Sequence, residues 1–120
     1  SNKMETLFQK INDLNKMILD GNTLDGFEKH YHDSVVMQEN EATPTVGKEA
    51  NRLRENEFFK AITEFRGAQV LSVTTGDNVT MVEWQFDYTH KDWGVRNYKQ
   101  ISVQQWVDGK IVKEKFYYGS

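Results

Sequence analysis

The chain has 120 residues, of which 15 are lysine or arginine and 18 are aspartate or glutamate, so its formal net charge is −3 with histidine neutral. Nucleic acids and anionic membranes attract basic surfaces, and this charge balance therefore argues against both as partners. The length suits a single domain, residues 1–120, with one hydrophobic core. Aromatic residues make up 12% of the chain, so a few large side chains must supply much of the buried area.

The chain contains no cysteine, which excludes disulfides, thiolate metal ligands and a cysteine nucleophile. This composition fits a reducing compartment, and we expect the protein in the cytoplasm. No apolar run approaches the roughly 20 residues that a membrane-spanning helix needs. The first residues also lack the charged-then-apolar pattern of a leader.

Two helices are predicted before residue 35. Apolar residues at helical spacing predict an amphipathic helix over about residues 3–20, with Gly21 as a left-handed cap. Its apolar residues are Met4, Leu7, Phe8, Ile11, Leu14, Met17 and Ile18. A short second helix, ending at residues 32–34, is marked by Leu24, Phe27 and Tyr31.

A third helix is predicted over about residues 48–62, after the loop that contains Pro44. The residues expected to face the core are Ala50, Leu53, Phe58, Ala61 and Ile62. The charged residues are expected to form a solvated face with i,i+3 ion pairs, and they are Glu49, Arg52, Arg54, Glu55 and Glu57.

The remaining segments have strand character. Strands are predicted at residues 35–40, 68–75, 79–90, 95–107 and 111–118. Asp108 and Gly109 separate the last two, and an Asp-Gly pair between two β-rich runs is a strong hairpin signal because both positions tolerate positive φ. Helices early and strands late indicate an α+β fold, with three N-terminal helices packed on a strongly curved antiparallel sheet.

Successive strand residues alternate between the two faces of a sheet, which limits the residues that could meet a ligand. In the segment 79–90, one face carries Val82, Trp84, Phe86 and Tyr88. These side chains either form plain core beneath the helices or, at Trp84 and Tyr88, line a ligand cavity.

The segment 95–107 has two possible registers. In the first, the inward side chains are Arg96, Tyr98, Gln100, Ser102, Gln104 and Trp106. Ile101, Val103 and Val107 would then be exposed on the outer face, which suits a homodimer through that face. In the second, the three apolar residues face the helices and the glutamines face water.

In the last strand, one face consists of Val112, Glu114, Phe116 and Tyr118. If this face points inward, Glu114 is the main carboxylate candidate. Desolvation among Trp84, Trp106 and Phe116 would raise its pKa and allow it to act as a proton shuttle near neutral pH. The alternative is a structural hydrogen bond or ion pair, or a position near the rim in water.

No cofactor is expected. His30, His32, Asp33 and His90 do not form a metal site by spacing alone, because no third ligand is fixed. The chain also lacks a glycine-rich phosphate loop and any context for a serine nucleophile. We therefore expect no metal, NAD-dependent or ATP-dependent chemistry.

The order of elements resembles the nuclear-transport-factor-2-like (NTF2-like) superfamily, also called cystatin-like, and its SnoaL-like branch in particular. The matching features are the long first helix, the stretch from Gly21 through Leu24-Asp25-Gly26-Phe27 to Asp33, Gly47, and Asp108-Gly109-Lys110-Ile111. The resemblance implies a cone of helices and bent sheet around a pocket, often as a dimer. The superfamily contains cyclases, isomerases, dehydratases, epoxide hydrolases and non-catalytic proteins, so the fold alone does not define a reaction.

Two catalytic patterns of the superfamily are not matched by the sequence. Some SnoaL-like cyclases have a histidine and an aspartate soon after Gly-Lys-Ile, whereas this chain has Val112-Lys113-Glu114-Lys115-Phe116. The isomerase pattern of a tyrosine and two acidic residues is not matched either.

We expect a SnoaL-like domain that binds a small, partly apolar molecule. The predicted pocket residues are Tyr31, Trp84, Phe86, Tyr88, Tyr98, Gln100, Ser102, Gln104, Trp106 and Phe116, with Glu114 as the catalytic candidate. One hypothesis is a cofactor-free isomerase, cyclase or dehydratase that acts on a carbonyl compound. The others are a non-catalytic ligand-binding or dimerisation module, and a protein-interaction module that uses the outer strand face.

Overall fold

The computed structural model describes residues 4–119, so residue 3, where the first helix was predicted to begin, lies outside the described part. The helices are α1 (Leu7–Leu19), α2 (Thr23–His30) and α3 (Lys48–Ala61). The strands are β1 (Tyr31–Glu39), β2 (Thr45–Val46), β3 (Ile62–Gly76), β4 (Val79–His90), β5 (Gly94–Val107) and β6 (Lys110–Tyr118). The predicted α+β class is confirmed.

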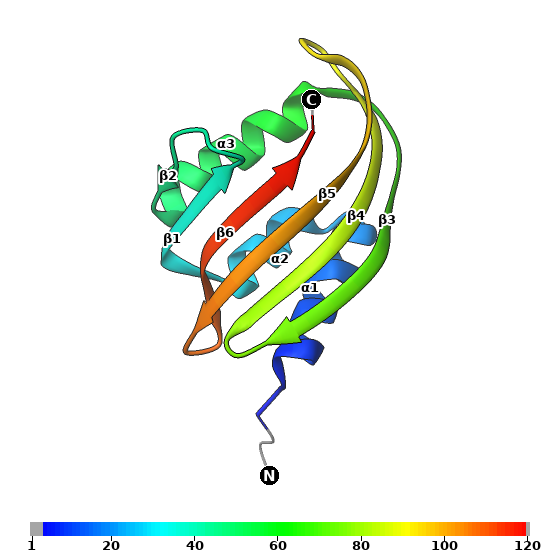
Figure 1. The fold of residues 1–120 in the computed structure, drawn as a ribbon. Coiled ribbons are helices and arrows are strands. Elements are labelled where there is room, and N and C mark those ends of the chain that lie inside the picture. The colour runs from blue at the N-terminus through cyan, green and yellow to red at the C-terminus, as the bar shows by residue number, and fades with distance from the viewer. Residues whose placement is uncertain (1–3, 120) are drawn as a thin grey trace.

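The strands form one six-stranded sheet in the order β2-β1-β6-β5-β4-β3. All neighbouring pairs are antiparallel except β1 and β6, which run parallel. Figure 1 shows the long strands β3 to β5 curving around one side of the molecule, with the helices on the concave side. Helix α1 contacts β3 and β4, whereas α3 packs on β1, so the helices leave a space above the middle of the sheet.

Helix α1 begins later than its apolar pattern suggested. Thr6 is the N-cap: its side chain accepts a bond from the Gln9 backbone N–H, and the Gln9 side chain accepts one from the Thr6 backbone N–H. Met4 therefore precedes the helix and is exposed, which corrects its predicted inward position. Phe8 is exposed as well, because it lies about 100° around the axis from Leu7. At the other end, Gly21 has φ +83°, as expected for a left-handed cap.

The second helix ends earlier than predicted. Tyr31 is the first residue of β1, and it pairs with Ile111 of β6 in the parallel ladder. Residues 32–34 therefore belong to a strand and not to a helix end. The cause is tertiary, because the backbone of this segment finds its partners in a strand 80 residues further along the chain.

The inward face of α3 also differs from the prediction. Ala50 and Leu53 are exposed, whereas Asn51 is 2% exposed and Phe58 lines the interior cavity described below. At 100° per residue, Asn51, Glu55 and Phe58 share one stripe, and Leu53 points the opposite way. The Nδ2 atom of Asn51 lies 3.3, 3.0 and 2.9 Å from the carbonyl oxygens of Val35, Thr45 and Gly47, respectively. A hydrogen-bonded polar residue thus fixes α3 where an apolar stripe was expected.

The C-terminal hairpin forms as predicted. Asp108 and Gly109 have φ values of +51° and +77°, which a two-residue turn of this kind requires. One detail differs: Trp106 pairs with Ile111 and Gln105 with Lys113, so Val112 is the extra residue of a β-bulge. As a result Ile111, and not Val112, is fully buried in the core.

Strand β5 adopts the first of its two registers. Ser102, Gln104 and Trp106 are buried, whereas Ile101 and Val107 are exposed on the outer face. The buried apolar cluster includes both inward tryptophans and Ile11, Leu14, Phe27, Val35, Val82 and Ile111. Within residues 4–119, no helix is both long and apolar enough to span a bilayer.

Candidate functional site

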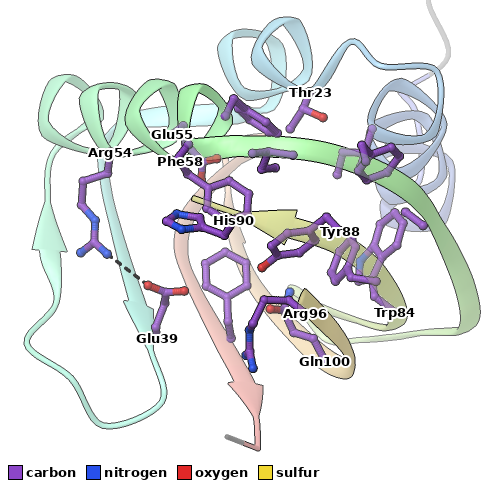
Figure 2. A pocket seen from close by; sticks show the side chains of 18 of the residues that line it. Thr23, Glu39, Arg54, Glu55, Phe58, Trp84, Tyr88, His90, Arg96 and Gln100 are labelled. Atoms are coloured by element: carbon purple, nitrogen blue, oxygen red, sulfur yellow. Dashed lines mark hydrogen bonds and ion pairs between the residues drawn. The ribbon is translucent and has the colours of Figure 1, made fainter. Parts of the chain in front are cut away.

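A cavity of about 1150 Å³ lies between the concave face of the sheet and helices α1 and α3. Figure 2 shows the view into it, with Trp84, Tyr88 and Gln100 rising from the sheet and Glu55 and Phe58 descending from α3. Ligand pockets in proteins usually measure about 300–1,000 Å³. The space is therefore large enough for a drug-sized molecule.

Nine of the ten predicted pocket residues line this cavity, and the exception is Trp106. Trp106 is 3% exposed and lies in the core beneath the cavity. On β4, Trp84 and Phe86 stack with ring centroids 5.2 Å apart and form part of the wall. Val82, one step deeper, is fully buried. The aromatic face of β4 thus serves as core at one end and as cavity wall at the other.

Five side chains beneath the cavity form a continuous buried hydrogen-bond chain. Trp106 Nε1 donates to Thr80 Oγ1 at 2.9 Å, and Thr80 Oγ1 donates to Gln104 Oε1 at 2.7 Å. Gln104 Nε2 then donates to Glu114 Oε2 at 2.7 Å. The hydroxyl of Tyr31 meets the other oxygen, Oε1.

Chemistry fixes the direction of this chain. The indole N–H of Trp106 can only donate, so the single hydrogen of the Thr80 hydroxyl is left for Gln104. The amide oxygen of Gln104 must face Thr80, and its NH₂ group must face Glu114. Glu114 therefore accepts at Oε2, and a proton on its carboxyl group would lie on Oε1, beside the hydroxyl of Tyr31.

Burial raises the pKa of Glu114 to about 7, although the hydrogen bonds from Tyr31 and Gln104 act in the opposite direction. Burial and the neighbouring Glu114 carboxyl also raise the pKa of the Tyr31 phenol well above its usual value. Tyr31 therefore keeps its proton at neutral pH. Glu114 lines the cavity, but both of its oxygens are already bonded within the protein.

A second carboxyl group, Glu55 on α3, faces the same cavity and was assigned to a solvated face in the sequence analysis; this assignment is wrong. Glu55 is only partly buried, but desolvation raises its pKa to about 7, with smaller contributions from the charges of Glu114 and Glu39. Within residues 4–119, Glu55 forms no hydrogen bond or ion pair. Its spacing of four residues from Asn51 and three from Phe58 is the sequence signal that could have placed it.

Aromatic side chains from α3 and from the turn between β4 and β5 form another part of the cavity wall. The ring of His90 stacks on Trp93 at a centroid distance of 3.7 Å and lies 6.2 Å from Phe58. His90 Nδ1 accepts the backbone N–H of Asp92 at 3.1 Å, so in the neutral ring the proton is on Nε2. His90 lines the cavity and is buried, whereas the sequence suggested a solvent-facing or capping histidine in preference to a metal ligand.

The histidines do not come together. His30 is bonded to Asp13 at 2.7 Å, and His32 is bonded to Ser34 at 2.8 Å. In the described part of the chain, no group of three or more histidine, aspartate or glutamate side chains is placed to hold a metal ion.

The open end of the cavity carries charged and phenolic groups. Arg54 Nη2 lies 3.1 Å from Glu39 Oε2, and the Tyr118 hydroxyl donates to Glu39 Oε1 at 3.1 Å. Opposite them, the guanidinium of Arg96 lies 4.5 Å from the ring centroid of Tyr98. Figure 2 shows Glu39 and Arg96 on opposite sides of this opening.

The tertiary structure thus brings Tyr31, Glu55 and Glu114 to a single cavity, which three other tyrosines and further acidic residues also line. Tyr31, Glu55 and Glu114 come from β1, α3 and β6, respectively. Two carboxyl groups with pKa values of about 7 can each accept or release a proton at neutral pH. The site is therefore suited to acid–base chemistry.

Solved structures with this fold define the class of protein. A candidate SnoaL-like polyketide cyclase from Mesorhizobium loti superposes with a TM-score of 0.86 at 23% identity, covering 95% of this chain and 100% of that one. An NTF2-like protein of unknown function from Burkholderia pseudomallei gives 0.81 at 12% identity, covering 97% and 92%. An LEH-like epoxide hydrolase from M. tuberculosis gives 0.73 at 10%, covering 92% and 80%. The fold is NTF2-like.

The SnoaL-like domain family matches residues 9–118, and the chain therefore belongs to this family. The comparison with curated proteins found no match. The solved structures carry names of several kinds, among them a cyclase, a hydrolase and a protein of unknown function. Their shared fold does not define the chemistry of this chain, and its own cavity has to supply that argument.

Proposed function

We propose that this protein binds a partly apolar carbonyl compound in its cavity and transfers a proton at the carbon next to the carbonyl group, without a cofactor. The observation that carries the proposal is the pair Glu55 and Glu114, two carboxyl groups in one cavity whose pKa values are both raised to about 7. A general base or acid works best when its pKa lies near the working pH. Isomerisation, cyclisation and dehydration of carbonyl compounds all include such a step.

The two carboxyl groups would have different roles. Glu55 has no partner among residues 4–119, so its carboxylate is free to take a proton from the ligand and return it elsewhere. Glu114 is held by Tyr31 and Gln104, and it would act with Tyr31 as a second proton-holding pair. The proton removed from carbon stays on Glu55, and the electron pair moves to the carbonyl oxygen as an enolate.

A hydrogen-bond donor for this oxygen is available on the wall. The hydroxyl groups of Tyr88 and Tyr98 lie 2.9 Å apart and share one hydrogen bond. Two hydroxyl groups carry two hydrogens, so one hydrogen is left over for a ligand. The pKa of Tyr98 is raised by burial and by Tyr88, which keeps this hydrogen in place at neutral pH.

Exchange of α-protons for deuterium tests the proposal without knowledge of the natural substrate. With 2-tetralone in D₂O, proton NMR should show exchange that the protein accelerates and that increases with pH around an apparent pKa of about 7. Glu55→Gln should abolish the acceleration. Glu49→Gln is the matched control, since Glu49 is exposed on the same helix and does not line the cavity. An equal acceleration in the wild type and Glu55→Gln would refute the role of Glu55.

One observation favours a second function, the non-catalytic binding module. Both oxygens of Glu114 accept bonds from a fully buried network, as a structural carboxyl group does. If 2-tetralone binds but its α-protons exchange at the rate seen without protein, the cavity is a binding site only. Titration of the tryptophan fluorescence measures the binding separately from the exchange.

We further propose that the protein forms a homodimer through the outer face of the sheet, in the cytoplasm. Met81 pairs with Val103, and Ile101 pairs with Tyr117, so the four residues lie side by side on the face opposite the cavity. Contiguous exposed apolar side chains often mark an interface. Light scattering after gel filtration should give twice the mass of 14.0 kDa, and Ile101→Lys should halve the measured mass. A wild-type monomer at high concentration would refute the dimer.

A further inference from the structure

The open end of the cavity holds a positive charge that the protein does not neutralise. Arg96 lines the cavity and is half-buried, yet it forms no hydrogen bond or ion pair with any of residues 4–119. Arg54, on the other side of the opening, is bonded to Glu39 at 3.1 Å and to Thr45 at 2.7 Å. Since arginine remains charged at all physiological pH values, the free guanidinium is a permanent cation beside an apolar space.

The position of Arg96 is fixed by a neighbouring ring. Its guanidinium carbon lies 4.5 Å from the ring centroid of Tyr98, in a cation–π contact. Tyr98 is held in turn by the hydroxyl of Tyr88 and by contact with Tyr118, whose ring centroid is 5.5 Å away. The N–H groups of the guanidinium are bonded to none of residues 4–119, so they remain available to a carboxylate.

We propose that Arg96 binds a carboxylate group of the ligand, so that the natural ligand is an elongated, largely apolar carboxylic acid. This inference rests on the proposed ligand-binding function of the cavity. A ligand with its carboxylate at Arg96 would place its apolar body against the aromatic wall of Tyr98, Phe86 and Trp84. Cationic ligands are disfavoured at this position, because Glu39 is already neutralised by Arg54 and accepts from Tyr118.

The spacing along β5 sets the length of the ligand. Arg96 and Ser102 lie on the same strand and face the cavity, six residues apart. A strand rises about 3.4 Å per residue, so their Cα atoms are separated by at most roughly 20 Å along this curved strand. A molecule that contacts both the guanidinium and the deeper polar wall needs several fused rings or a long acyl chain.

A matched pair of fluorescent probes tests the inference. 1-Pyrenebutyrate and 1-pyrenebutanamide have the same shape, but only the first is an anion at pH 8. Energy transfer from tryptophan to pyrene reports the binding of each. We expect the wild type to bind the carboxylate about 10-fold more tightly than the amide, which corresponds to about 1.4 kcal/mol.

The variants separate charge from shape. Arg96→Gln should remove the preference, and Arg96→Lys should retain part of it, because lysine keeps the charge but lacks the planar fork. Lys99→Gln is the control, since Lys99 is an exposed cation on the same strand that does not line the cavity, and it should retain the full preference. Unfolding midpoints of all variants show whether each remains folded.

The possible failures are distinguishable. Equal affinity of the wild type for the two probes would overturn the carboxylate site and leave the proposed cavity function in place. A 10-fold preference that persists in Arg96→Gln would also overturn it, because another group would then hold the anion. If neither probe binds at millimolar concentration, this inference and the proposed binding function are both overturned.

Discussion

The buried carboxyl group of Glu114 should make the protein less stable as the pH rises through the neutral range. Burial raises the pKa of Glu114 from 4.5 to about 7 in the folded protein. Between these two values the folded state holds a proton that the unfolded state has released. The free energy of unfolding therefore decreases as the pH rises from about 4.5 to 7 and is level above that range. Glu114→Gln replaces the carboxyl group with a neutral isostere and should remove this dependence.

The magnitude follows from the size of the shift. Each unit of pKa difference between the folded and unfolded states corresponds to about 1.4 kcal/mol, so Glu114 alone should remove about 3 kcal/mol of stability between pH 4.5 and pH 8. The amide that Glu114→Gln introduces can accept from Gln104 and donate to the oxygen of Tyr31, as the protonated carboxyl group can, and in both cases the phenol hydrogen of Tyr31 loses Glu114 as its acceptor. The variant should be more stable than the wild type at pH 8 by a similar amount.

Urea unfolding at several pH values, followed by tryptophan fluorescence, measures the effect. Two other groups also change the free energy of unfolding in this pH range, and both are present in the wild type and in the variant. Glu55 lowers the free energy of unfolding as the pH rises, because its pKa is raised as well. Burial lowers the pKa of His30, which contributes an increase in stability as the pH rises towards 6.5, the ordinary value. The difference between the two proteins at each pH therefore isolates Glu114 and its coupling to Glu55.

Two results would refute this reasoning. If the wild type and Glu114→Gln have parallel stability curves from pH 5 to pH 8, then Glu114 does not titrate with a raised pKa in the folded state. If the variant is less stable than the wild type at pH 8, the ionised carboxylate is stabilising, and its two hydrogen bonds outweigh its desolvation.

Two further substitutions test the buried polar contacts. Thr80→Val should cost about 3 kcal/mol in urea unfolding, because it leaves Trp106 Nε1 and Gln104 Oε1 without partners, whereas Thr80→Ser keeps the hydroxyl and should cost about 1 kcal/mol. Equal costs for the two variants would show that volume and not hydrogen bonding matters here. Asn51→Ala should cost about 2 kcal/mol, because the carbonyls that Asn51 serves are buried beneath α3, and Asn56→Ala, which loses one bond to Arg52, should cost less than half as much. A loss for Asn51→Ala no larger than that for Asn56→Ala would contradict the role of Asn51 in fixing the helix.

Local sequence patterns were sufficient to predict the positions of the strands β4 and β5 and of the turns that bound them. The predicted range of β4, residues 79–90, agrees with the structure at both ends, and β5 begins one residue before its prediction. These segments have clear alternation and are bounded by turn residues with positive φ, such as Asn78 and Gly94. Alternation and turn residues depend only on positions that are close in sequence. A single amino-acid sequence therefore contains all the information needed to recognise them.

Where a partner is distant in sequence, the predictions were less accurate. Strand β3 begins at Ile62, six residues before its prediction, because three irregularities in its pairing with β4 interrupt the alternation. The segment at Tyr31 was predicted as helical, since nothing nearby reveals its pairing with Ile111. In both cases the backbone conformation depends on hydrogen bonds to another strand.

By itself, the sequence determined the α+β class, the order of the long elements, the hairpin at Asp108 and the set of residues that share a strand face with Glu114. These depend on periodicity, turn chemistry and the alternation of strand faces, which are local properties. Only the tertiary structure decided that Glu55 faces the cavity, that Trp106 fixes the direction of the bonds reaching Glu114, and that Arg96 remains unpaired among residues 4–119. The physical reason is that desolvation and ion pairing depend on which groups from different helices and strands come close in space. The order of residues along the chain does not by itself specify these spatial neighbours.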